Sequence, residues 1–196
     1  MKILFLGDVV GLSGCKKITN DLLGQIKKNN IDFVIINAEN ADDSGVGLTK
    51  EICKDFFENG VDVITTGNHV WDQKDIMNFI DKEKRLLRPQ NLFEPAPGRG
   101  FEIYKTKKNH RVGVLNLMGN VFMKKCDDVF KISKEFLEKY DLKKDYDFLI
   151  VDFHGEITSE KNAIGHYFDG KATLVIGTHT HIPTNDARIL KNGTAY

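Results

Sequence analysis

Residues 32–40 have the sequence DFVIINAEN, in which an apolar run passes directly into the polar side chains Asn37, Glu39 and Asn40. A short, uninterrupted apolar run bounded by polar residues predicts a buried β-strand, here residues 32–37. The strand is followed by a carboxylate and carboxamides, which are residue types that bind metal ions. This stretch therefore predicts both a buried strand and a functional position at its carboxyl end.

Four more predicted strands end in the same manner, in polar residues that are able to bind a metal ion. The strands 2–7, 61–66, 147–153 and 172–177 are followed, in that order, by Asp8, Asn68-His69, His154-Gly155-Glu156 and Thr178-His179-Thr180-His181. In α/β folds, the chemistry gathers in loops just beyond the carboxyl ends of the strands. One such ending is common, but five in one chain are hard to explain by chance, so we expect one functional site.

Amphipathic helical segments alternate with these strands. We expect helices near residues 16–29, 49–59, 75–80, 129–140 and 159–168, further strands at 101–105, 111–117 and 186–190, and an irregular segment at 88–99. This alternation predicts an α/β fold with largely buried sheets. A chain of 196 residues is long enough to bury a hydrophobic core, so we expect a single domain, residues 1–196.

The bulk composition excludes several classes of protein. Lys and Arg number 28, as do Asp and Glu, so no net positive charge supports an extended nucleic-acid surface, although a small nucleotide substrate stays open. Cys15, Cys53 and Cys126 are widely spaced and form no CxxC pair, which predicts reduced thiols in a cytoplasmic protein. No apolar run approaches the ~20 residues of a membrane span, so we expect no membrane segment.

The residue types at the strand ends favour particular metal ions. Asp8 and Glu39 offer carboxylate oxygens, and the two oxygens of Glu39 are able to bridge two ions. His154, His179 and His181 offer imidazole nitrogens, which suit iron, manganese, zinc or cobalt better than magnesium or calcium. A mixed set of nitrogen and oxygen ligands without a thiolate predicts a catalytic site with open coordination positions.

Two metal ions ~3.5–4 Å apart are a known device for phosphoryl chemistry. They polarise the phosphorus–oxygen bonds and lower the pKa of a bound water, whose hydroxide then attacks in line. The leaving oxygen benefits from a proton donor. His69 stands next to the candidate ligand Asn68 and is the natural candidate for this general acid.

Each of these residues also has a purely structural interpretation. Asp8 fits a helix cap, Asn68 fits a left-handed turn, and His154 fits a hydrogen-bonded core histidine. The strongest local pattern is His179-Thr180-His181, because alternate residues of an extended segment face the same side and both imidazoles would reach one metal centre. The joint pattern, rather than any single residue, decides in favour of a metal site.

The strand-end motifs resemble those of the calcineurin-like metallophosphoesterases. The matching pieces are, in order, Gly7-Asp8, Glu39-Asn40, Gly67-Asn68-His69, His154 and Gly177-Thr178-His179-Thr180-His181. Val10 stands where that superfamily usually has a histidine, and Glu39 stands where it usually has a bridging Asp. These two departures resemble the bacterial YmdB-like branch, described as 2′,3′-cyclic-nucleotide 2′-phosphodiesterases, in which an Asn after the Glu fills the place of the missing histidine.

The resemblance implies an α/β sandwich of two central mixed β-sheets flanked by α-helices, with two divalent or trivalent metal ions at the strand ends. It implies that the first ion is held by Asp8, Glu39, Asn40 and His181, and the second by Glu39, Asn68, His154 and His179. His69 would be the general acid. Iron is the expected metal, with manganese as a substitute, and the expected reaction is hydrolysis of 2′,3′-cyclic nucleotides or related phosphodiesters.

Two other functions stay open from the sequence. The same metal centre would serve a phosphomonoesterase or protein phosphatase, with specificity in loops 42–48, 88–100 and 119–128. A regulatory module would bind nucleotide without turnover; residues 7–14, GDVVGLSG, faintly resemble a glycine-rich loop but lack the Lys-Ser/Thr of a P-loop.

Members of the YmdB-like branch usually continue beyond the position that matches Tyr196, so we expect a C-terminally shortened chain. The sequence is also compatible with a homo-oligomer.

Overall fold

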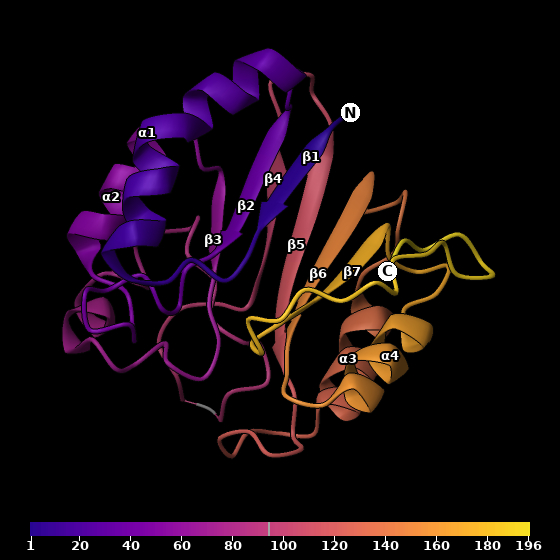
Figure 1. The fold of residues 1–196 in the computed structure, drawn as a ribbon. Helices are drawn as coiled ribbons and strands as arrows, with labels where there is room; N and C mark the ends of the chain where they lie inside the picture. The colour runs from indigo at the N-terminus through magenta and orange to yellow at the C-terminus, as the bar shows by residue number, and fades with distance from the viewer. Residues whose placement is uncertain (94) are drawn as a thin grey trace. The chain divides into compact units, whose positions relative to one another are not determined.

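The computed structural model describes residues 1–93 and 95–196. Its contacts divide the chain into two compact units, Met1–Arg88 with Pro97–Arg99, and Pro89–Ala96 with Gly100–Tyr196. Each unit contains one β-sheet and its own helices (Figure 1), which confirms an α/β fold with two sheets flanked by helices. Among the helices of the described residues, none is both long and apolar enough to cross a membrane.

The first unit is built on a three-stranded sheet. Its order is β1 (Ile3–Leu6), β2 (Phe33–Asn37) and β3 (Val63–Thr65), and both strand pairs are parallel. The expectation of a mixed sheet is therefore wrong for these three strands. All five residues of the central strand β2 are buried, whereas β1 at the edge is half-buried throughout. A central strand of a parallel sheet is buried on both faces, and the apolar run in residues 33–36 suits this position.

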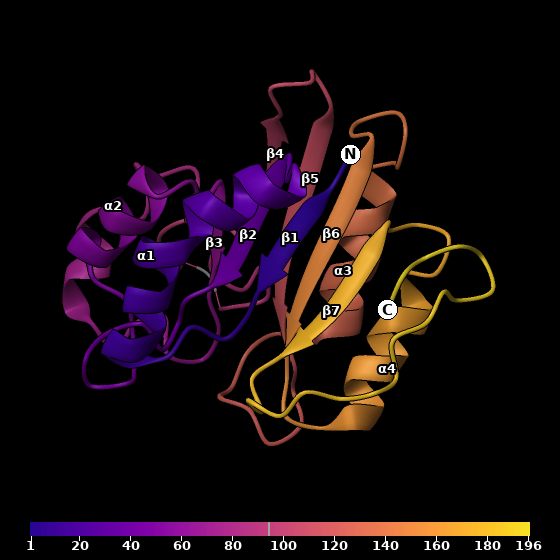
Figure 2. The ribbon, with the colours of Figure 1, turned by 45° about the horizontal axis from the view of Figure 1, so that its top comes forward.

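Helices connect the parallel strands of the first unit, because parallel pairing needs a crossover. They are α1 (Gly11–Asn29) and α2 (Lys50–Glu58), which lie side by side in Figures 1 and 2. The segment predicted as a helix at 75–80 is a 3₁₀ helix, η1 (Lys74–Asn78). Helix α1 begins five positions before the predicted residue 16. The sequence does not reveal this start, because Val10 gives no side-chain cap and Gly11 is a poor helix former.

The second unit is built on a four-stranded mixed sheet, as predicted. Its order is β4 (Phe101–Lys105), β5 (Arg111–Met118), β6 (Phe148–His154) and β7 (Leu174–Thr178). Strand β4 is antiparallel to β5, and the other two pairs are parallel. Helices α3 (Val129–Lys139) and α4 (Thr158–Tyr167) lie next to each other (Figure 2). Strand β6 is buried along nearly its whole length and carries His154 at its carboxyl end.

The core of the second unit is closed by aromatic side chains. Phe153 on β6 and Phe168 at the end of α4 are fully buried in one apolar cluster with Leu115, Val151 and Ile164. Removing a buried phenyl ring loses its transfer free energy and leaves a cavity. The last turn of α4 and the end of β6 are therefore held by the same packing.

Phe168→Ala is expected to lower the free energy of unfolding by about 3–5 kcal/mol, because the Phe168 side chain is fully buried. Chemical denaturation with a two-state fit measures this change. The matched control is Phe122→Ala, since Phe122 is 84% exposed; a change within about 0.5 kcal/mol is expected there. Equal losses in the two variants would contradict this description of the core.

The prediction of a last strand at 186–190 is wrong. Ile189 forms an isolated antiparallel bridge with Ala195, flanked by backbone hydrogen bonds of 3.0 and 2.9 Å between Arg188 and Tyr196, across a turn in which Gly193 has a φ of 101°. Side chains from Ala187 to Ile189 are exposed, so no buried face fixes a longer register. Instead, Ala195 pairs in parallel with Leu174 on β7, and its backbone exchanges hydrogen bonds of 3.0 and 2.9 Å with Thr173 and Val175.

Candidate metal centre

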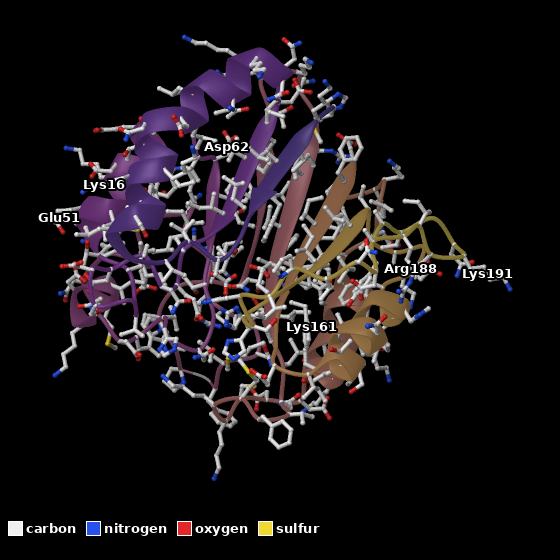
Figure 3. All side chains as sticks on the ribbon, in the orientation of Figure 1. Lys16, Glu51, Asp62, Lys161, Arg188 and Lys191 are labelled. Atoms are coloured by element: carbon white, nitrogen blue, oxygen red, sulfur yellow. The ribbon has the colours of Figure 1, made fainter. Side chains whose placement is uncertain are left out.

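In the first unit, the predicted ligands follow the carboxyl ends of parallel strands, which lie at one edge of the sheet. Backbone hydrogen bonds tie the loop after β1 to the loop after β2: the N–H of Val9 donates to Asn37 O at 2.9 Å, and the N–H of Gly11 donates to Asn40 O at 2.8 Å. The loop that carries Asp8 is thereby tied to the loop that carries Glu39 and Asn40. Asp62, labelled in Figure 3, marks the opposite end of β2, where its carboxylate accepts from the N–H of Val34.

Glu39 is a buried acidic residue, with only 1% of its surface exposed. Its Oε2 accepts a hydrogen bond of 2.9 Å from the backbone N–H of His69, which follows β3. Burying a carboxylate is costly unless it is paired or coordinates a metal ion. Glu39 therefore has the environment expected of a ligand, and it connects the loop after β2 to the loop that carries Asn68 and His69.

Asn40 offers a direct test of whether a cation fits these residues. Its side-chain Nδ2 donates to Gly45 O at 2.9 Å, which fixes the orientation of the amide. Its Oδ1 is buried and accepts no hydrogen bond from any residue that the structure describes. A buried acceptor left in this state costs about 1–3 kcal/mol. A bound cation would satisfy this oxygen, so the environment of Asn40 fits a metal ligand.

His69 has a partner that the sequence analysis missed. Its Nδ1 lies 2.6 Å from Oδ2 of Asp72, three residues further along the same turn. Since a carboxylate only accepts, Nδ1 donates to Asp72, and this contact does not involve the opposite ring nitrogen. The presence of Asp72 three residues after His69 could have indicated this contact. The spacing alone, however, does not show whether the turn brings the two side chains together.

In the second unit, two predicted ligands are brought together. His154 ends β6 and is fully buried, and His179 follows the neighbouring parallel strand β7. Nε2 of His154 and Nδ1 of His179 are 3.0 Å apart. That is about the spacing of two neighbouring nitrogen ligands on one cation, for which metal–nitrogen bonds of ~2.1 Å are typical. The pair therefore also fits a metal site.

Further polar residues surround this histidine pair. Oε2 of Glu156 lies 3.0 Å from Nε2 of His179. Lys161 of α4, labelled in Figure 3, donates to Oγ1 of Thr180 at 3.3 Å. Neither contact was expected from the sequence, although Glu156 belongs to one of the strand-end motifs.

The structure corrects the expectation that His179-Thr180-His181 is an extended segment whose two imidazoles face the same side. His179 and His181 have φ values of 104° and 54°, so the segment is not extended and simple alternation does not set the directions of the two rings. His181 is exposed, unlike His154. Positive φ is uncommon outside glycine and clusters at functional sites.

A family model described as YmdB-like protein matches residues 4–196 of the chain. The chain belongs to this family. The match spans all the strand-end motifs, and it confirms the resemblance that Glu39 and Asn40 indicated.

Relatives of the YmdB-like chain agree with this assignment. A 2′,3′-cyclic-nucleotide 2′-phosphodiesterase of Bacillus subtilis is 44% identical over the whole chain, which covers 73% of that protein. A putative phosphatase/phosphodiesterase of Mycoplasma pneumoniae is 41% identical, again over the whole chain and 70% of the relative. Both relatives are thus longer than this chain.

Solved structures show the same similarity. A crystal structure of a hypothetical protein from Thermus thermophilus superposes with a TM-score of 0.91 and 37% identity, over the whole chain and 74% of that structure. A crystal structure of a novel phosphatase from Mycoplasma pneumoniae gives a TM-score of 0.90 and 40% identity, over the whole chain and 70% of that structure.

Proposed function

We propose that this protein is a metal-dependent phosphodiesterase that hydrolyses 2′,3′-cyclic nucleotides or related phosphodiesters. The observation that carries the proposal is its 44% identity, over the whole chain, to the phosphodiesterase of Bacillus subtilis. The environments of Asn40, Glu39 and His154 support it, because each is buried in a manner that suits a metal ligand. With the family, we also infer the calcineurin-like sandwich and a single domain, residues 1–196.

The proposed ligands are those that the motifs indicate. Asp8, Glu39, Asn40 and His181 would hold one cation, and Glu39, Asn68, His154 and His179 would hold the other. Iron is the proposed metal, with manganese as a substitute, as the resemblance to the YmdB-like branch implies; nitrogen and oxygen ligands without thiolate are compatible with both. When bound, such a pair of cations polarises the phosphodiester and offsets its charge during in-line attack by water.

The chain's own residues would complete the reaction by moving a proton. As the bond between phosphorus and the 2′ oxygen breaks, that oxygen takes a proton from His69. Asp72 would orient His69 through the 2.6 Å contact at Nδ1, so that the opposite nitrogen faces the leaving oxygen. The expected product is the 3′-monophosphate. The three cysteines are all free, which agrees with the cytoplasm as the proposed location.

Metal dependence tests the proposal most directly. We expect protein loaded with Mn²⁺ or Fe²⁺ to convert 2′,3′-cyclic AMP to the 3′-monophosphate, and protein treated with a chelator to lose this activity until metal is restored. Chromatographic separation of the 2′- and 3′-monophosphates identifies the product. Absence of turnover in protein shown to contain two metal ions would overturn the proposed substrate.

A phosphomonoesterase is the second candidate, because relatives in Mycoplasma pneumoniae are described as a putative phosphatase/phosphodiesterase and as a novel phosphatase. Comparing bis(4-nitrophenyl) phosphate with 4-nitrophenyl phosphate separates the two activities. We expect the diester to react faster; a faster monoester would favour the second candidate.

A further inference from the structure

A chain of hydrogen bonds leads from His154 into the interior of the second unit. Nδ1 of His154 lies 3.0 Å from Oγ1 of Thr178, and the same Oγ1 lies 2.7 Å from Oδ1 of Asp152. All three side chains are buried, with exposed fractions of 0%, 7% and 0% for His154, Thr178 and Asp152. Neither Thr178 nor Asp152 is one of the proposed metal ligands.

The sheet brings these three groups together through its register. Asp152 and His154 are two positions apart on β6, so their side chains share one face of the sheet. Thr178 is paired with His154 across the parallel strands β6 and β7. The three groups therefore come from regular, buried strands, and their geometry does not depend on a loop.

The protons in this chain can be counted. A hydroxyl has a single proton, and Thr178 donates it to the carboxylate of Asp152, which only accepts. The lone pairs of Oγ1 then face His154, so Nδ1 of His154 must carry a hydrogen. In a neutral imidazole the other nitrogen, Nε2, then carries a lone pair in place of a hydrogen, and this is the atom that lies 3.0 Å from His179.

We propose that Thr178 and Asp152 are positioning residues that hold His154 in the tautomer with an unprotonated Nε2, ready to bind a cation. The inference rests on the metal site of the proposed function. Histidines that bind metal ions are commonly fixed through their other ring nitrogen, and loss of such a partner typically costs 10–100-fold in metal affinity. Here the carboxylate acts through a hydroxyl, so its effect depends on the direction of the Thr178 O–H bond.

Three variants test the relay through Mn²⁺ affinity, measured by equilibrium dialysis. Thr178→Val keeps the shape of the side chain but removes the hydroxyl, and a loss of about 10–100-fold is expected. Thr178→Ser restores the hydroxyl and is expected to stay close to the wild-type affinity. Thr173→Val is the matched control, because Oγ1 of Thr173 accepts from the N–H of Leu149 at the other end of the same strand pair; its affinity should not change.

Asp152→Asn tests the direction of the proton. If the new amide presents its NH₂ group to Thr178, the hydroxyl must turn its proton toward His154 and favour the wrong tautomer. We expect a loss of Mn²⁺ affinity in this variant too, although it removes no side-chain volume. Nitrogen NMR of the His154 ring in metal-free protein provides a readout that altered packing would not reproduce: hydrogen on Nδ1 in the wild type, and loss of that preference in Thr178→Val.

Unchanged Mn²⁺ affinity in Thr178→Val would overturn the relay, and so would an equal loss in Thr173→Val. Hydrogen on Nε2 of His154 in the wild type would also overturn it. Failure of the proposed function gives a different result. If the variants lose Mn²⁺ affinity as expected but the wild-type protein does not hydrolyse 2′,3′-cyclic AMP, the relay is supported and only the proposed substrate is rejected.

Discussion

Glu39→Gln is expected to lower kcat/KM for 2′,3′-cyclic AMP by on the order of 10³-fold or more. Metal ions supply several kcal/mol of charge stabilisation in phosphoryl transfer, and about 1.36 kcal/mol corresponds to a factor of ten in rate. The amide keeps the size of the side chain and still has an oxygen to accept from the N–H of His69, so the loop after β3 should stay in place. The variant removes the charge that would bridge the two cations.

Metal content and activity, measured on the same preparation, check this result. Glu51→Gln is the matched control, because Glu51 is an exposed residue in the first turn of α2 and should leave both quantities unchanged. Asn68→Ala extends the test to a neutral residue that is proposed to bind the second cation. Wild-type kcat/KM in Glu39→Gln, together with an unchanged metal content, would show that Glu39 is not a ligand.

His69→Asn is expected to lower kcat for 2′,3′-cyclic AMP by about 10²–10⁴-fold, the usual contribution of a general acid. The loss should be much smaller with bis(4-nitrophenyl) phosphate, because 4-nitrophenolate is a good leaving group and needs little help from a proton. Metal content should stay at the wild-type level, since His69 is not a proposed ligand. The comparison of two leaving groups therefore isolates proton donation from binding.

His166→Asn is the control for the His69 variant, because His166 is exposed in the last turn of α4. Asp72→Asn should lose less activity than His69→Asn, in the same leaving-group-dependent manner, since Asp72 contacts Nδ1 of His69 and is proposed to act through it. Equal losses with both substrates in His69→Asn would be incompatible with a general acid and would indicate a role in substrate binding.

Several features of the fold could be predicted from local pattern. The apolar runs of β2 and β6 are long, uninterrupted and bounded by polar residues, and the structure buries both strands as expected. Helix α2 was predicted within a residue at each end, because Thr49 caps it by accepting from the N–H of Ile52. The start of α1 and the strand at 186–190 were predicted wrongly, since neither a cap nor a buried face defines them.

The candidate site divides in the same way. The sequence by itself determined which polar residues follow the strands, because an apolar run and the polar residues that end it are patterns of neighbouring residues along the chain. Only the tertiary structure decided that Thr178 meets His154, 24 residues away, and that His179 and His181 leave the extended conformation. These contacts depend on which strands are neighbours, on their register and on backbone angles, and no local pattern of residue types specifies them.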